Sequence, residues 1–172
     1  MNQVKFKKKN KACFFDRDGV LNKDTGYLYK KEDFQWIEGV LDAISLLKDK
    51  GFKIIVVSNQ SGIGRGFYTK EDVDKLHKWI NVQLKNYNNT SIDDFYYACE
   101  HPDTSKTLRR KPSPKMIEEA LSDHNLDPER CFLVGDKITD LQAAKKAKIK
   151  GFLFEGGNLL VRIEKILKVH DF

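Results

Sequence analysis

The sequence is poor in cysteine and has no long apolar run. Its three cysteines, at positions 13, 99 and 131, are odd in number and far apart. Such a set argues against a disulfide framework, so we expect free thiols in a reducing compartment. No apolar run approaches the roughly twenty residues that span a bilayer, and none follows the N-terminal lysines as in a secretory signal. We therefore expect a cytoplasmic protein.

Internal repeats and low-complexity linkers are also absent, and 172 residues suit one folded domain. We expect a single domain over residues 1–172, with residues 1–11 as a basic N-terminal arm. The net charge is +6, to which the arm contributes Lys5, Lys7, Lys8, Lys9 and Lys11. No nucleic-acid-binding module accompanies the arm, so we interpret it as solvated. We expect a monomer with neither nucleic acid nor membrane as a partner.

Short apolar runs alternate with segments of helical periodicity, as is typical of parallel β-α-β units. The runs predicted to be strands are 12–15, 54–57, 95–98, 131–134 and 151–154. Thr69 and Asp72 indicate a capped helix start, and Pro114 is expected at the first position of another helix. The pattern predicts an α/β fold: a doubly wound, mostly parallel, Rossmann-like sheet of five strands. Ligands of such sheets bind at the carboxyl ends of the strands.

Asp16 and Asp18 directly follow the first apolar run. Side chains two residues apart in a strand point to the same side, so these two carboxylates can converge where the strand ends. Two anions held that close repel each other unless a cation or a reaction uses them. A lone Asp-x-Asp more often marks a polar loop, so the functional interpretation depends on what the other strand ends supply.

The second predicted strand ends in Ser58, Asn59 and Gln60, and a glycine-containing loop, residues 61–66, follows. This loop offers backbone amides for an anion and the guanidinium of Arg65, although such glycines more often mark a tight turn. The fourth strand ends at Asp136. Four residues later comes a further carboxylate, Asp140, that is either a second acidic group of the site or the N-cap of the next helix.

Together with Lys111, from the cationic run at residues 109–111, these groups suit phosphoryl transfer. A hard divalent cation such as Mg²⁺ takes oxygen ligands and would offset the repulsion among Asp16, Asp18 and Asp136. A carboxylate can then attack phosphorus and form an aspartyl-phosphate. The metal and the lysine would stabilise the charge on the transferring oxygens.

The ordered set Asp16-x-Asp18-Gly-Val, Ser58, Lys111 and Gly135-Asp136-x3-Asp140 resembles the haloacid dehalogenase superfamily. The resemblance implies that Asp16 is the nucleophile and that Asp18 is the general acid and later the base. It implies that Ser58 and Lys111 hold the phosphoryl group. It also implies that Asp136 completes a Mg²⁺ site with Asp16 and the backbone carbonyl of Asp18.

A closer resemblance is to the D-glycero-D-manno-heptose-1,7-bisphosphate 7-phosphatases and the related histidinol-phosphate phosphatases. The resemblance rests on these segments: 16–22, 26–27, 59–66, 110–112 and 135–137. It implies a fold without a large cap domain and a role in nucleotide-heptose and lipopolysaccharide core biosynthesis. The residues expected to bind the phosphosugar are Asp24, Thr25, Gly26, Tyr27, Ser58, Asn59, Gln60, Ser61, Arg65, Arg110, Lys111 and Lys137. Arg110 would meet the second phosphate of a bisphosphate.

The sequence departs from this family at its structural zinc site. The four ligand positions of typical members are taken here by Ala98, Glu100, Thr107 and Arg109. Four ligands are the norm for a structural zinc, so we expect none. The loop that carries these positions shapes the choice of substrate in the family, so its change affects the prediction of the substrate more than the prediction of the chemistry. The alternatives are histidinol phosphate, a nucleic-acid 3′-end, and a phosphosugar-binding protein without catalysis.

Overall fold

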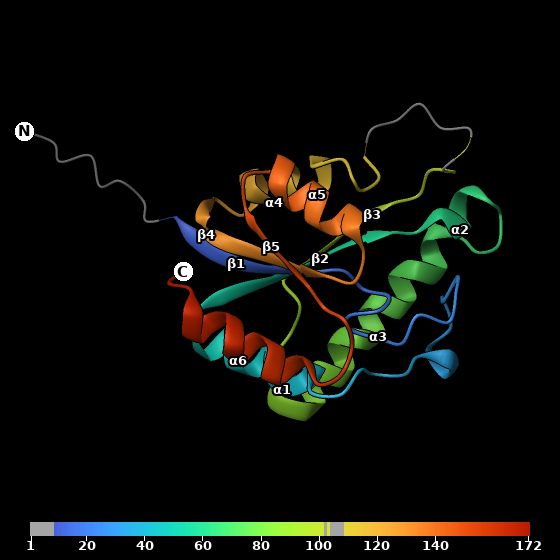
Figure 1. Cartoon of the computed structure of the whole chain (residues 1–172). Coiled ribbons are helices and arrows are strands. Elements are labelled where there is room, and N and C mark those ends of the chain that lie inside the picture. Colours follow the sequence, from blue (N-terminus) through green and yellow to red (C-terminus); the bar gives the residue numbers. More distant parts are fainter. Residues whose placement is uncertain (1–8, 102, 104–108) are drawn as a thin grey trace, which may run out of the picture.

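A parallel sheet of five strands forms the centre of the computed structural model, which describes residues 9–101, 103 and 109–172 (Figure 1). The strands lie in the order β3-β2-β1-β4-β5, and every pairing is parallel. Their bounds are β1 Asn10–Phe15, β2 Phe52–Asn59, β3 Asp94–Ala98, β4 Leu126–Gly135 and β5 Lys150–Leu153. The doubly wound α/β fold is thus confirmed, with a sheet that is wholly rather than mostly parallel.

Helices cover both faces of this sheet. Their bounds are α1 Val40–Asp49, α2 Ser61–Gly64, α3 Lys70–Asn88, α4 Lys115–Asp123, α5 Ile138–Lys146 and α6 Leu159–Val169, with a short 3-10 helix at Lys31–Asp33. Figure 1 shows α1, α3 and α6 on one side of the sheet and α4 and α5 on the other. Thr69 caps α3 as predicted, because its hydroxyl accepts a 3.2 Å bond from the backbone amide of Asp72. Pro114 is the N-cap of α4 and not its first helical residue, which corrects the prediction.

Alternate side chains of the central strand β1 enter two separate apolar clusters. Cys13 and Phe15 pack toward α1, α3 and α6, whereas Ala12 and Phe14 pack toward α4 and α5. All four are fully buried. A strand that is covered on both faces has a continuous apolar run in its sequence, and this run located β1.

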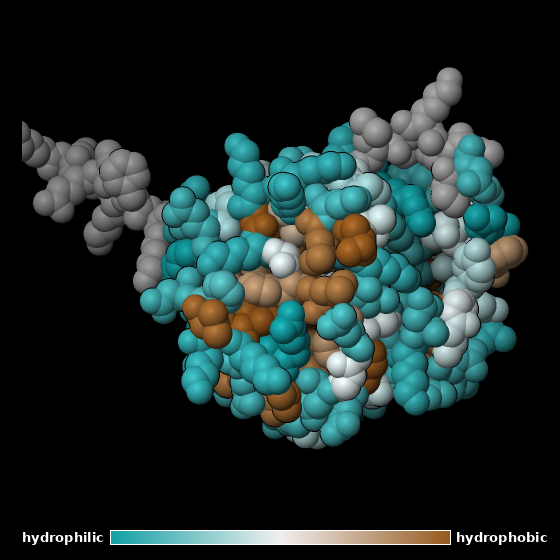
Figure 2. All heavy atoms as spheres, viewed as in Figure 1, coloured by the Kyte–Doolittle hydropathy of each residue, from teal (hydrophilic) through white to brown (hydrophobic). Residues whose placement is uncertain are grey.

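The surface is largely hydrophilic in the view of Figure 2, apart from a hydrophobic patch over the edge strand β5. Within the described part of the chain, no helix combines the length and the apolar character needed to cross a membrane. The three cysteines are free thiols. Most of the predicted basic arm, residues 1–8, lies outside the described residues.

His77 of α3 is buried against the sheet. Its ring stacks on Phe95 with centroids 4.0 Å apart, and its Nε2 atom has no partner among the described residues. Burial, with a smaller contribution from the charge of Arg17, lowers the pKa of His77 to about 3. The folded protein therefore holds this imidazole neutral.

We expect His77 to destabilise the fold in acid. The unfolded chain takes up a proton near pH 6.5, but the folded chain does so only near the pKa of about 3, so the unfolded state binds more protons between these values. The free energy of unfolding should then fall by up to about 1.4 kcal/mol per pH unit in this window. His77→Phe keeps a stacking ring and should make the fall shallower. Urea unfolding of both proteins between about pH 4 and 7 gives the slope of the free energy of unfolding against pH for each. Equal slopes would contradict the role of His77 in this pH dependence.

Candidate active site

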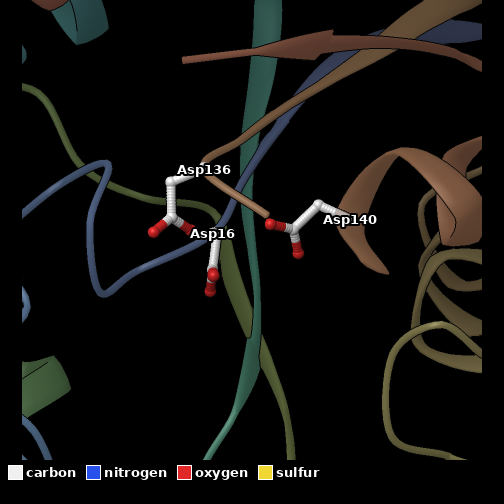
Figure 3. A group of neighbouring side chains, drawn as sticks. All are labelled: Asp16, Asp136 and Asp140. Atoms are coloured by element: carbon white, nitrogen blue, oxygen red, sulfur yellow. The ribbon is translucent and has the colours of Figure 1, made fainter. Parts of the chain in front are cut away.

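Three carboxylates converge at the carboxyl edge of the sheet, as Figure 3 shows. Asp16 follows β1, Asp136 follows β4, and Asp140 lies in the first turn of α5. One oxygen of each lies within 4.8 Å of the others. Parallel strands all end at the same edge, so the topology brings Asp16 to two residues that are 120 positions or more away in the chain. The cluster is acidic, compact and mostly buried.

The burial of this cluster disfavours its negative charge. Burial raises the pKa of Asp16 to about 6, although the ammonium of Lys111 opposes the rise. Burial raises the pKa of Asp136 as well, and its Oδ1 atom is buried without a partner among the described residues. Three hard oxygen donors, one of them unsatisfied, fit a divalent cation such as Mg²⁺.

Gly19 makes room for one of these carboxylates. Its φ is +91°, and a Cβ atom there would lie 2.2 Å from Oδ2 of Asp136. Any other residue would therefore collide with the carboxylate and strain the backbone. The glycine of the Asp-x-Asp-Gly motif thus allows the loop after β1 to approach the end of β4.

One of the two sequence interpretations made Asp140 the N-cap of α5, and this interpretation is wrong. The N-cap position belongs to Lys137, whose backbone amide donates a 3.0 Å hydrogen bond to Oδ2 of Asp140. The other oxygen, Oδ1, lies 2.6 Å from the ammonium of Lys111. Asp140 therefore stabilises the helix start with one oxygen and faces the site with the other. The side chain of Asp18, by contrast, lies outside the acidic cluster.

Lys111 is a buried cation between two of these carboxylates. Its Nζ atom lies 3.0 Å from Oδ1 of Asp16 and donates a 2.7 Å hydrogen bond to the carbonyl of Val57. Burial would lower the pKa of Lys111, but Asp16 and Asp140 offset it, so the pKa lies above its usual value. Asn59 holds the lysine backbone through reciprocal bonds of 2.9 and 3.1 Å. The ammonium is thus charged and fixed.

A cavity of about 660 Å³ opens over these groups. The predicted site residues that line it are Asp16, Asp18, Asp24, Gly26, Tyr27, Ser58, Asn59, Gln60, Ser61, Arg110, Lys111 and Lys137. Asp136 lies in the acidic cluster beside it. Thr25 and Arg65 do not line it. Arg65 instead faces the loop after β3, where its guanidinium lies 3.7 Å from Asp103.

Five lining residues were not assigned to substrate, metal or catalysis from the sequence: Tyr68, Pro112, Ile138, Thr139 and Asp140. Asp140 and Pro112 already lie inside the quoted motifs, and Ile138 and Thr139 lie between Lys137 and Asp140, so assigning every residue of these motifs to the site would have included them. Tyr68 carried no such signal. Its hydroxyl reaches Gln60 at 2.8 Å only because α2 folds the chain back on itself.

Two cations other than Lys111 face the cavity. Arg110 has a buried Nη1 atom without a partner among the described residues. Lys137 donates a 3.1 Å hydrogen bond to Asp24 across the opening. Partial burial would raise the pKa of Asp24, but bonds from Gly26 and Lys137 lower it below its usual value.

Two of the four positions at which the resemblance implied zinc ligands have a clear structural role here. Ala98 is buried at the end of β3, and Arg109 forms an ion pair of 2.7 Å with Glu119 of α4. The same guanidinium donates to the backbone carbonyl of Tyr97. Thr107 lies outside the described residues. The absence of zinc stays a prediction.

Comparison with known proteins agrees with this geometry. A family model described as polynucleotide kinase 3 phosphatase matches residues 11–151. A D-glycero-beta-D-manno-heptose-1,7-bisphosphate 7-phosphatase from Haemophilus ducreyi is 41% identical over 145 residues, 81% of this chain and 80% of that protein. One from Helicobacter pylori is 36% identical over 163 residues, 95% of this chain and 94% of that protein. The chain belongs to the family of these heptose-bisphosphate phosphatases. It is therefore a phosphatase of the haloacid dehalogenase superfamily.

Solved structures of this phosphatase family share the fold. A D,D-heptose 1,7-bisphosphate phosphatase from B. bronchiseptica, complexed with magnesium and phosphate, superimposes with a TM-score of 0.84 at 25% identity and covers 93% of this chain and 99% of its own. A putative phosphatase of the same superfamily from Mesorhizobium loti gives a TM-score of 0.80 at 30% identity, covering 91% and 78%. The first shows that a relative with this sheet holds Mg²⁺.

We expect Mg²⁺ to stabilise this phosphatase through the acidic cluster. Bound cation relieves the repulsion among Asp16, Asp136 and Asp140, so a Mg²⁺ concentration 100-fold above Kd should add about 2.7 kcal/mol to the free energy of unfolding. Asp136→Asn should remove most of this gain. Glu155→Gln, an exposed carboxylate elsewhere, is the matched control. Unfolding curves with and without Mg²⁺ measure the effect, and an equal gain in Asp136→Asn would contradict the site.

Proposed function

We propose that the chain is a magnesium-dependent phosphatase that removes the 7-phosphate of D-glycero-D-manno-heptose 1,7-bisphosphate. It would act in nucleotide-heptose and lipopolysaccharide core biosynthesis. The observation that carries the chemistry is a buried Asp16 carboxylate beside the Lys111 ammonium, at the floor of a polar cavity. The substrate is supported by relatives of that name that match nearly the whole chain. We further propose that the chain is one domain, because both apolar clusters pack on one sheet.

Asp16 would attack the phosphorus atom of the substrate with its carboxylate. The bond from phosphorus to the sugar oxygen breaks, Asp18 gives that oxygen a proton, and an aspartyl-phosphate forms. Asp18 then takes a proton from water, whose oxygen attacks the aspartyl-phosphate, releasing inorganic phosphate and restoring both carboxyl groups. Mg²⁺, when held by Asp16, the Asp18 carbonyl and Asp136, supplies positive charge against the phosphate oxygens.

Ser58 and Lys111 are suited to hold the transferring phosphoryl group. The hydroxyl of Ser58 is buried at the end of β2 and lines the cavity. The ammonium of Lys111 is fixed by Asp16, Asp140 and the Val57 carbonyl, so it needs no reorganisation when charge develops on phosphoryl oxygens. Such preorganised charge is where most electrostatic catalysis arises.

Arg110 supports a substrate with a second phosphate. Arg110 lines the cavity, and its Nη1 atom is buried without a partner among the described residues, which is costly for a donor. A phosphate on the far end of the sugar would satisfy it. Histidinol phosphate, which has one phosphate, leaves this guanidinium without a partner. Tyr27, which also lines the cavity and is 48% exposed, offers a ring face to the sugar between the two phosphates.

Asp16→Asn should abolish turnover and leave the fold intact. The amide lacks the nucleophilic charge, so phosphate release should fall by at least about 10³-fold. Asp127→Asn, on β4 away from the site, is the control. Release of phosphate with Mg²⁺ and thermal unfolding should be measured on both. Substantial activity in a folded Asp16→Asn protein would overturn the nucleophile assignment.

The substrate is tested with a panel of phosphate esters. We expect kcat/KM for the heptose bisphosphate to exceed that for histidinol phosphate, fructose 1,6-bisphosphate and a 3′-phosphorylated oligonucleotide by about 10²-fold, near 3 kcal/mol in the transition state. Arg110→Gln should reduce the preference over histidinol phosphate, because that ester has no second phosphate to bind the guanidinium. The oligonucleotide tests the activity that the matching family model names. Highest activity on another ester would keep the mechanism and replace the substrate.

A further inference from the structure

Arg17 is a charged side chain with no exposed surface, directly between two residues of the proposed mechanism. Its relative exposure is 0%, and it does not line the cavity. Its Nε and Nη2 atoms donate to the carboxylate of Asp18 over 2.9–3.1 Å. Nη2 also reaches the carbonyl of Leu28 at 2.7 Å and Oε1 of Gln60 at 3.2 Å. Burying a guanidinium is costly, so this arrangement calls for an explanation.

The contacts of Asp18 show what the buried charge holds. Besides Arg17, Oδ1 accepts a 2.9 Å bond from the side-chain amide of Asn22, and Oδ2 accepts a 2.9 Å bond from that of Gln60. Both oxygens are thus engaged by donors from two different loops, after β1 and after β2. The Asp18 side chain is 18% exposed at the cavity wall. Hydrogen bonds from Arg17, Asn22 and Gln60 thus hold its carboxylate.

Gln60 is itself oriented by two donors. Its Oε1 accepts from the hydroxyl of Tyr68 at 2.8 Å and from Arg17. The amide nitrogen is therefore directed to the opposite side, where it donates to Asp18 and, at 2.8 Å, to Oγ of Ser58. Arg17, Gln60 and Tyr68 form a continuous network that ends on Asp18 and on Ser58.

We propose that Arg17 is a positioning residue that, with Gln60 and Tyr68, aims the carboxyl group of Asp18 at the leaving oxygen. It does not line the cavity, so it acts on the substrate only through the carboxyl group of Asp18. A general acid contributes about 10²–10⁴-fold only when it lies within hydrogen-bond reach of the atom it protonates. A small misplacement loses much of that factor. The inference rests on the role of Asp18 in the proposed function.

Two substrates with different leaving groups can distinguish a positioning role of Arg17 from a merely structural one. A sugar alkoxide is a poor leaving group and needs the proton of Asp18 as the bond to phosphorus breaks. A p-nitrophenolate ion departs without a proton. The value of kcat/KM covers only the steps through release of the leaving group, so the later hydrolysis of the aspartyl-phosphate does not enter it. Loss of the correct position of Asp18 should therefore lower kcat/KM for the sugar ester and leave kcat/KM for the aryl ester almost unchanged.

The experiment compares kcat/KM for heptose 1,7-bisphosphate and p-nitrophenyl phosphate in the full chain with Mg²⁺. Arg17→Lys keeps the charge but not the bidentate geometry. We expect it to lower kcat/KM for the sugar ester about 10–100-fold and for the aryl ester less than about threefold. Asp18→Asn should show the same selectivity, and Arg17→Lys in that background should add little, because both changes remove one function.

Tyr68→Phe keeps the test decisive if Arg17→Lys does not fold. It removes only the hydroxyl that orients Gln60, and we expect a selective loss of about three- to tenfold on the sugar ester. Tyr87→Phe is the matched control, since its hydroxyl bonds Asp42 on the exposed surface and should affect neither ester. Equal losses on both esters, or none on either, would overturn the inference.

A wild-type protein inactive on the heptose bisphosphate would instead contradict the proposed substrate. The comparison then uses the alkyl phosphate of the panel with the highest kcat/KM, because positioning of Asp18 concerns any alkoxide leaving group. The two failures are therefore distinguishable: the first appears in the wild type, and the second appears only in the variants.

Discussion

Repulsion among carboxylates gathered at one edge of the sheet is the constraint on which the site depends. Asp16, Asp136 and Asp140 place oxygens within 4.8 Å of one another in a mostly buried space. One protein cation, Lys111, lies between two of them and is held by a backbone carbonyl as well. It leaves Asp136 with an oxygen that has no partner among the described residues, so the remaining repulsion favours the binding of a divalent cation, as the proposed function requires.

The residues around this edge have two roles: some supply charge, and others fix the orientation of a reactive side chain. The acidic cluster and Lys111 concentrate charge where phosphorus would be attacked. On the other side of the loop after β1, a fully buried Arg17 fixes the carboxylate of Asp18. One short segment thus supplies a reactive group and the support for its partner.

Most of the fold could be predicted from the sequence because its signals are local. Apolar runs located all five strands, and the buried central strand β1 was found from residues 12–15. Strand ends then identified Asp16, Ser58 and Asp136, since parallel strands place their carboxyl ends together. Single positions were less certain: Pro114 precedes α4, and Asp140 lies inside α5 instead of capping it. Cap positions depend on dihedral angles that composition does not fix.

The sequence by itself determined the sheet, the edge where its motifs gather and the residue types that the proposed chemistry needs, because periodicity and motifs are read from neighbouring residues. Only the tertiary structure decided which side chains meet. It directed Arg65 to the loop after β3, brought the Tyr68 hydroxyl to Gln60, and placed Arg109, at a position where the family resemblance implied a zinc ligand, against Glu119. Such contacts join residues from different segments of the chain, and they follow from packing, which no local pattern records.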